Sequence, residues 1–262
     1  MKIRKYFLMI IAIVLLFSNL ITSKQVEAEQ LLTVDEIMDK MEETAPDFTT
    51  QKTISEMVII DEKGNEETRK MIMFSQKEED DKTSTLIRFL SPNSVKGVTL
   101  LNINNGEKIY LYLPAYNKPR RIAGASKQEE FMGTGLSYED MSMDYQDKDY
   151  TKTILEETEK EFKIEVIPLG EDTSYKKIIL WVDKEKFYSK KVEFYDEVEN
   201  LTKTLEIQKI EIDEKGKITP LEIEFSDLEN KKKTKIIIKE MEYNIDLSSD
   251  FFSLRTLSKP TL

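Results

Sequence analysis

Residues 161–168 read EFKIEVIP, where apolar and charged side chains alternate, and residues 178–194 read IILWVDKEKFYSKKVEF, where two apolar-rich runs flank a charged DKEK. Successive side chains of a β-strand point to opposite faces of a sheet. The apolar residues of the first stretch, Phe162, Ile164 and Val166, therefore share one dry face, and the charged residues between them face water. The second stretch carries a charged turn in its middle and predicts an antiparallel hairpin.

The same alternation runs from Phe48 to Tyr243 and is broken by charged turns. A change of phase between Ile207 and Ile210 predicts a β-bulge. Pro220 lacks a backbone N–H and predicts a strand edge or a second bulge. The alternating runs predict roughly ten or eleven strands and a mainly β fold, either a large, strongly curved antiparallel sheet or a partly open barrel.

One segment near the start of this pattern is helical instead. In residues 33–43, Thr33 can cap a helix that has Glu36 at its third position, and apolar residues then follow at helical spacing. A wide, curved sheet leaves apolar volume that a helix, a ligand or both must fill. This helix and residues 131–141 are the candidate covers, and the spacing favours neither a movable lid nor a fixed plug.

The chain begins like an exported protein. Basic residues at 2–5 precede an apolar stretch at 6–17, and small residues follow at 26–28. This order predicts a signal peptide over residues 1–28, with an uncleaved signal anchor as the alternative. Residues 29–262 are then expected to form a single domain in the periplasm or elsewhere in the extracytoplasmic cell envelope.

The composition excludes several kinds of chemistry. The chain has no histidine and no cysteine, so the usual zinc sites, hydrolase triads and thiol chemistry lack their residues. We expect no enzyme, no metal and no cofactor. The formal net charge of −11 argues against nucleic acid as a partner and against stable docking on anionic lipid, so membrane contact is expected to be peripheral or transient.

Irregular segments punctuated by glycine and proline interrupt the strands. They read SPNSVKG at 91–97, YLYLPAYNKPRRI at 110–122 and FMGTGLSYEDM at 131–141. Together with the hairpin at 180–196 and the ending DFFS at 250–253, they resemble the LolA-like outer-membrane lipoprotein-sorting family. The resemblance is to the longer, uncharacterised branch of that family and covers essentially the whole chain after the export segment.

The resemblance implies a half-open barrel of antiparallel strands, covered by helices and lid loops, around an apolar cavity. Such a cavity takes a lipid or a lipoprotein acyl chain from an envelope donor and carries it to an acceptor. The chain departs from the branch at Tyr110, where a tryptophan is frequent, and at Thr134 and Gly135, where serine and aspartate are frequent.

The candidate ligand-binding residues are aromatic or apolar and lie in or near these segments. Gly133 and Gly135 permit a tight loop that would deliver its neighbours onto the cavity mouth. For Tyr110 and Tyr112, burial in a strand between the sheet and a cover is the alternative to ligand contact. The full candidate set is Tyr110, Tyr112, Phe131, Met132, Leu136, Tyr138 and Trp181.

Two functions fit this sequence. In the first, the protein shields an acyl chain from water and hands it to an acceptor. In the second, an envelope sensor, regulator or assembly protein uses the same fold to bind a protein partner. Lipid recovered with the protein would favour the first function, and a stoichiometric protein partner would favour the second.

Overall fold

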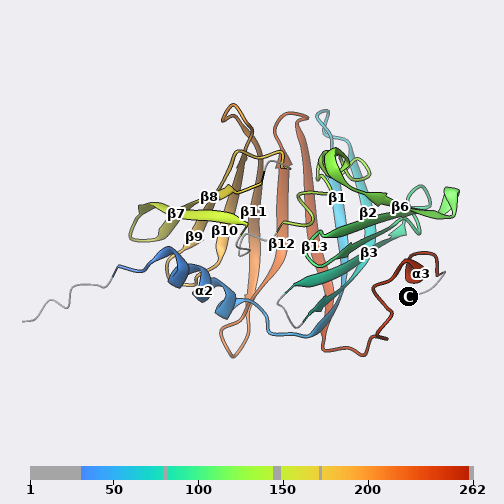
Figure 1. Ribbon diagram of the computed structural model, residues 1–262, viewed down its shortest axis with the longest axis horizontal. Helices are drawn as coiled ribbons and strands as arrows, with labels where there is room; N and C mark the ends of the chain where they lie inside the picture. The colour runs from blue at the N-terminus through green and yellow to red at the C-terminus, as the bar shows by residue number, and fades with distance from the viewer. Residues whose placement is uncertain (1–30, 79–81, 144–148, 171–172, 260–262) are drawn as a thin grey trace, which may run out of the picture. The chain divides into compact units, whose positions relative to one another are not determined.

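The alternating segments pair into one antiparallel sheet of 13 strands in a computed structural model of the chain (Figure 1). The structure describes residues 31–78, 82–143, 149–170 and 173–259, and the expected export segment at 1–28 lies outside these ranges. Within the described ranges, no helix is long and apolar enough to cross a membrane.

The strands follow one another as two meanders within the compact unit Thr33–Leu262. In chain order they are β1 (Thr50–Ile60), β2 (Glu66–Lys77), β3 (Thr83–Ser91), β4 (Thr99–Ile103), β5 (Lys108–Leu113), β6 (Lys118–Ile122), β7 (Tyr150–Glu157), β8 (Glu161–Pro168), β9 (Lys177–Asp183), β10 (Ser189–Tyr195), β11 (Leu201–Ile212), β12 (Ile218–Asp227) and β13 (Lys232–Tyr243). In space the order is β6-β5-β4-β3-β2-β1-β13-β12-β11-β10-β9-β8-β7. The first and last strands of the chain therefore pair in the middle of the sheet, and β6 and β7 are its edges.

This architecture confirms the predicted mainly β fold with one large, curved antiparallel sheet. The sheet has more strands than expected because short strands, β4, β5 and β6, form within and between the first two punctuated segments. The predicted bulge is present, since the pairing of β11 with β12 shifts register between Ile207 and Ile210. Pro220 pairs with β11 alone, because the pairing of β12 with β13 begins at Glu222.

The cross-strand pairs define two faces of the sheet. One face, called the inner face here, carries the paired residues Ile164, Leu180, Val192, Leu205 and Phe225. It continues across β13 and β1 through further pairs in the same row. The opposite, outer face is largely charged over the central strands, where lysines and glutamates pair across β12, β13 and β1.

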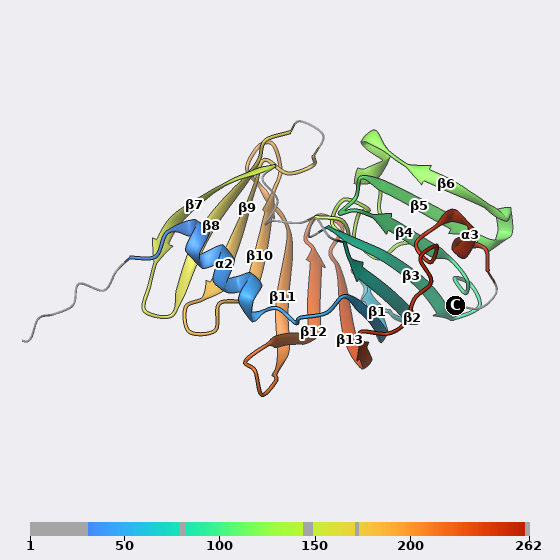
Figure 2. The ribbon, with the colours of Figure 1, turned by 60° about the horizontal axis from the view of Figure 1, so that its bottom comes forward.

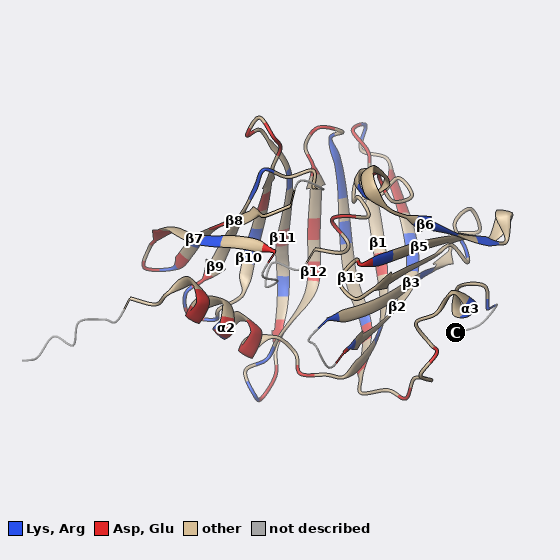
Figure 3. Ribbon diagram, in the orientation of Figure 1, with Lys and Arg blue, Asp and Glu red and all other residues tan. Residues whose placement is uncertain are grey.

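Helix α2 (Val34–Thr44) covers the inner face over β8–β10 (Figure 1 and Figure 2). Thr33 and Glu36 form the predicted capping box at its start. Ile37 is fully buried under the helix, while its acidic residues occupy much of its remaining surface (Figure 3). The Thr44 hydroxyl donates to the carbonyl of Phe187 at 2.8 Å and thereby ties the end of the helix to the β9–β10 hairpin.

Residues 123–143, called the cover segment here, lie on the inner face toward the other half of the sheet. The segment begins with a short 3₁₀ helix, η2 (Gly124–Gln128). Its backbone is bound from below, because Arg69 of β2 donates to the Met132 carbonyl at 2.7 Å and Thr234 of β13 donates to the Thr134 carbonyl. The segment therefore spans the junction of the two meanders.

The outer face of β2–β5 is covered by residues 245–259, called the C-terminal strap here, which include the short helix α3 (Leu254–Leu257). Its apolar residues pack on Phe74, Leu86 and Leu101 of the sheet. Arg88 fastens the strap: its guanidinium donates to the carbonyls of Thr256, Leu257 and Lys259 at 2.8–3.1 Å and to the Thr99 hydroxyl at 2.8 Å.

Arg88→Met is expected to loosen this strap. The change removes a buried charged donor and leaves strap carbonyls unpaired, so the free energy of unfolding should fall by about 2–4 kcal/mol. Chemical denaturation measures the loss, and hydrogen exchange should locate it in residues 245–259. Arg121→Met on the exposed edge strand β6 is the matched control and should change stability by less than about 0.5 kcal/mol.

Candidate functional site

An apolar strip of half-buried side chains lies on the inner face of the central strands. Ile207 of β11 pairs with Ile223 of β12, which pairs with Ile236 of β13, and Ile236 pairs with Met57 of β1. The strip consists of Leu205, Ile207, Leu221, Ile223, Ile236 and Ile238, all of intermediate exposure. An apolar surface that extends over several neighbouring strands can bind an apolar ligand or be covered by a segment that moves.

The cover segment closes one side of this strip with an aromatic cluster. Phe131 stacks on Phe89 of β3, with ring centroids 5.6 Å apart, and Tyr138 meets Phe131 edge-on at 5.6 Å. Phe131, Leu136 and Tyr138 are at most 8% exposed. Burial also raises the pKa of the Tyr138 phenol. In this structure the cluster fills space against the sheet, as the plug alternative predicted.

A polar clamp holds the end of the cover segment. The Asp140 carboxylate accepts from Lys203 of β11 at 2.7 Å, from the backbone N–H of Ser137 at 2.7 Å and from the Tyr175 hydroxyl. Its side chain is only 2% exposed. The neighbouring Glu139 carboxylate accepts from the backbone and hydroxyl of Ser174. The adjacent carboxylates thus bind different partners and tie the cover to β11 and to the segment before β9.

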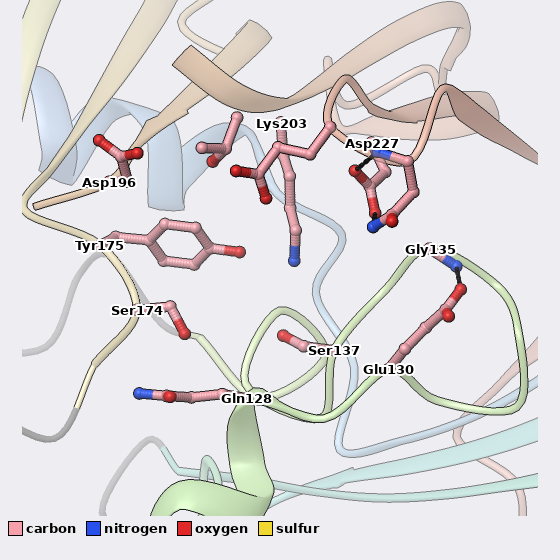
Figure 4. Close-up of a pocket in the computed structure, with 12 residues that line it drawn as sticks. Gln128, Glu130, Gly135, Ser137, Ser174, Tyr175, Asp196, Lys203 and Asp227 are labelled. Atoms are coloured by element: carbon pink, nitrogen blue, oxygen red, sulfur yellow. Dashed lines mark hydrogen bonds between the residues drawn. The ribbon is translucent and has the colours of Figure 1, made fainter. Parts of the chain in front are cut away.

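A pocket of about 220 Å³ lies beside this clamp (Figure 4). Figure 4 shows Tyr175 pointing into it from the left and Lys203 from above, with Ser137 below them and Gln128 along the lower edge beneath Ser174. Its remaining lining is also mostly polar: Glu130, Gly135, Ser174, Asp196, Thr202, Asp227, Glu229 and Asn230. Such a lining does not suit an acyl chain, and the clamp explains why Lys203 lies there.

The structure brings together four of the seven candidate residues. These four are Phe131, Met132, Leu136 and Tyr138, which all belong to the cover segment on the inner face. Tyr110 and Tyr112 lie on the outer face under the C-terminal strap, where the Tyr112 hydroxyl donates to Asn117 at 3.1 Å. Trp181 also points outward, because its paired neighbours are Lys163 and Lys191.

Sequence reasoning missed the strip as a site. Its isoleucines were predicted as strand residues, but the predicted ligand-binding residues all lie in or near the irregular segments and the hairpin. The available signal was the alternation in Leu205, Ile207 and in Leu221, Ile223, which extends the apolar inner face over more strands than one helix and one loop segment can cover. The clamp gave no comparable signal, because Lys203 and Asp140 are 63 positions apart.

An antiparallel sheet with a helix and a loop over one apolar face defines the LolA-like class of β proteins, and solved structures share it. A structure described as an outer membrane lipoprotein-sorting protein domain, from Vibrio parahaemolyticus, matches with a TM-score of 0.80 and 25% identity over 86% of this chain and 98% of its own. A DUF1329 family protein from Desulfovibrio piger gives 0.76 and 24% over 85% and 97%. A LolA superfamily protein from Nitrosomonas europaea gives 0.68 and 20% over 85% and 98%.

The sequence comparison narrows this class. A family described as an uncharacterized protein has a sequence profile that matches residues 81–259, which is more than half of the chain. The chain belongs to this family, and it shares the LolA-like fold with the solved structures above. Among curated protein sequences, none matches the chain. The predicted family membership is confirmed.

Lys203→Met tests the clamp. The substitution leaves the buried Asp140 carboxylate without its cation, so the free energy of unfolding should fall by about 3 kcal/mol. Hydrogen exchange should rise in residues 137–143 before the rest of the sheet opens. The matched control is Lys239→Met, which breaks an exposed ion pair with Glu56 on the outer face and should cost at most about 1 kcal/mol. Equal losses in the two variants would contradict a fastening role for Lys203.

Proposed function

We propose that this protein is an exported cell-envelope protein that binds a lipid or a lipoprotein acyl chain on the apolar strip and carries it to an acceptor. The observation that carries the proposal is the row of half-buried isoleucines on β11–β13. A sheet that needed only a packed core would bury these side chains fully, as it buries Ile164 and Leu180 under α2. The binding is non-covalent and needs no catalytic group.

The energetics suit a reversible carrier. Each methylene removed from water contributes about 0.8 kcal/mol, so a 14-carbon chain gains on the order of 10 kcal/mol before the cost of association. The strip is already half-buried, and a ligand must also displace part of the cover segment, which both reduce this gain. The net gain is smaller than this figure, so the dissociation constant should be micromolar or weaker, which permits uptake from a donor and release to an acceptor.

The proposed contacts begin with the strip and extend to the cover segment. Phe131, Leu136 and Tyr138 of the cover segment are buried against the sheet beside the strip. Met132, in the turn of the same segment, is half-buried. When the cover moves outward, these side chains would line the ligand. We do not include Tyr110, Tyr112 and Trp181 in this contact surface, because they lie on the outer face.

Export to the periplasm or another extracytoplasmic compartment completes the proposal. It is supported by the basic and apolar start of the chain and by the lipoprotein-sorting description of the Vibrio parahaemolyticus domain. Residues 1–28 would serve as signal peptide or anchor, and residues 29–262 as the single ligand-binding domain. Donor and acceptor are envelope proteins or membranes that the protein contacts transiently.

Ile236→Ser tests the strip. The substitution places a hydroxyl where the chain would lie and removes apolar contact, so binding of a fluorescent 16-carbon fatty acyl probe should weaken about 10-fold. The matched control is Ile237→Ser, the next residue of β13, which is half-buried on the outer face between Glu222 and Glu56. This control should bind the probe like the unchanged protein.

Native mass spectrometry of protein released gently from membranes is the second measurement. We expect bound lipid with the unchanged protein and less of it with Leu136→Asp, which puts a charge at the cover. Protein that carries no lipid, binds no acyl probe and instead retains one stoichiometric protein partner would contradict the carrier function and support the partner-binding alternative.

A further inference from the structure

A row of neutral polar side chains crosses the inner face next to the apolar strip. Asn102 of β4 pairs with Thr85 of β3, Thr85 with Ser75 of β2, and Ser75 with Gln51 of β1. Thr53 follows two positions along β1 and therefore points to the same face. These five residues, called the polar row here, occupy positions that packing alone would fill with apolar side chains.

Two members of the row each have one buried side-chain oxygen that finds no hydrogen-bond partner among the residues that the structure describes. Thr53 is 1% exposed and its hydroxyl has none. Asn102 is 7% exposed, and although its amide nitrogen donates to the Met141 carbonyl at 3.5 Å, its side-chain oxygen accepts no hydrogen bond. Buried polar groups are nearly always paired in native proteins. The Thr53 hydroxyl and the Asn102 oxygen therefore point to a bound molecule that pairs with them.

The surroundings of the row restrict what that partner is. Thr53 pairs with Met73 of β2 and Met241 of β13, and the next inner-face positions of β1 are Ser55 and Met57. None of these positions carries a charge. A phosphate or carboxylate beside Thr53 would lose its hydration without gaining a lysine or arginine among these neighbours, and this makes an anionic head group unfavourable at Thr53.

We propose that the polar row binds the uncharged head group of an amphiphile whose acyl chain lies on the apolar strip. This inference rests on the proposed function and names its ligand class: an acyl chain attached to a head that bears hydroxyl or amide groups. The Asn102 oxygen needs an O–H or N–H donor, and the Thr53 hydroxyl can donate to an ester or amide carbonyl. The two residues stand three strands apart and are offset by two positions along the strands, roughly 16 Å in a flat sheet, so a head that meets both carries polar groups at more than one place.

The row and the strip are parts of one surface. Ile238 of the strip pairs with Ser55, and Thr53 follows Ser55 on the same face of β1. A chain on the strip therefore leads directly toward Thr53. Among the charged groups of this face, Arg69 and Lys203 bind the cover segment, and Lys77, two positions beyond Ser75 on β2, lies over the Phe48 ring.

The test compares two probes with the same chain, 1-monopalmitoylglycerol and palmitate, at pH 8. We expect the unchanged protein to bind the glycerol ester at least 10-fold more tightly. Thr53→Val should reduce this preference about 5-fold, because the glycerol head follows the chain toward Thr53, and Asn102→Leu should reduce it less, because a head this short cannot meet both residues. Both variants should leave palmitate binding unchanged or slightly tighter. Thr204→Val, which removes the same hydroxyl from the outer face of β11, is the matched control and should leave both affinities unchanged.

The melting temperature of the Thr53→Val variant is an independent test of the same inference. Because Thr53→Val replaces an unpaired hydroxyl by a methyl group of the same shape, the melting temperature of ligand-free protein should stay the same or rise. If Thr53 serves binding, the Thr53→Val variant should lose affinity for the glycerol ester while its melting temperature stays the same or rises. A lower melting temperature of this variant would show that the hydroxyl supports the fold, and would overturn the inference at Thr53.

The possible outcomes distinguish failure of the head-group inference from failure of acyl-chain binding itself. If both probes bind equally and the variants behave like the unchanged protein, water alone satisfies Thr53 and Asn102, and the head-group inference fails while acyl binding stands. A preference for palmitate has the same meaning. If neither probe binds at any concentration below its aggregation limit, the proposed function itself fails, and the head-group inference falls with it.

Discussion

The pairing of β1 with β13 is the interaction on which the rest of the structure depends. It joins strands that are about 190 positions apart in sequence, through ten cross-strand pairs from Gln51 with Tyr243 to Ile60 with Lys233. Every other strand pair joins sequence neighbours within one of the two meanders. Without this central ladder the two meanders would be separate sheets, and neither would have the continuous inner face that carries the apolar strip.

The two meanders that meet at this central pairing are covered by different segments. Each meander has its own inner cover, α2 on one side and the cover segment on the other, and the outer face of β2–β5 has the C-terminal strap. The strands between the two inner covers keep half-buried isoleucines and neutral polar residues. The cover segment is held by a few charge-assisted hydrogen bonds, with Asp140 and Arg69 among them, so it can be released at a limited free-energy cost.

Local patterns predicted what local physics determines. The alternation around Phe162 predicted strands, Thr33 and Glu36 predicted the helix start, and Pro220 predicted a break in pairing. The family resemblance supplied the half-open architecture. What stayed out of reach depends on register across the whole sheet: whether Trp181 points inward is decided by a chain of pairs from β9 to β1 and not by its own segment.

The same limit applied to the candidate site. The cover-segment residues Phe131, Leu136 and Tyr138 could be grouped because they are close in sequence. Thr53 and Asn102 could not, because their shared face and their missing partners appear only when four strands are aligned. Neutral residues such as threonine and asparagine also carry no chemical signature that a sequence alone would mark as a site.

The open sheet leaves two free borders, and each has a feature that discourages another chain from adding a strand. β6 contains Pro119, which offers no backbone donor, followed by two exposed arginines that repel a second copy of the same border. β7 has a register shift between Ile154 and Glu156 that distorts its outer line of backbone groups. A protein with an accessible apolar surface must avoid strand-by-strand aggregation, and these two borders allow its sheet to remain open without offering a regular edge to another strand.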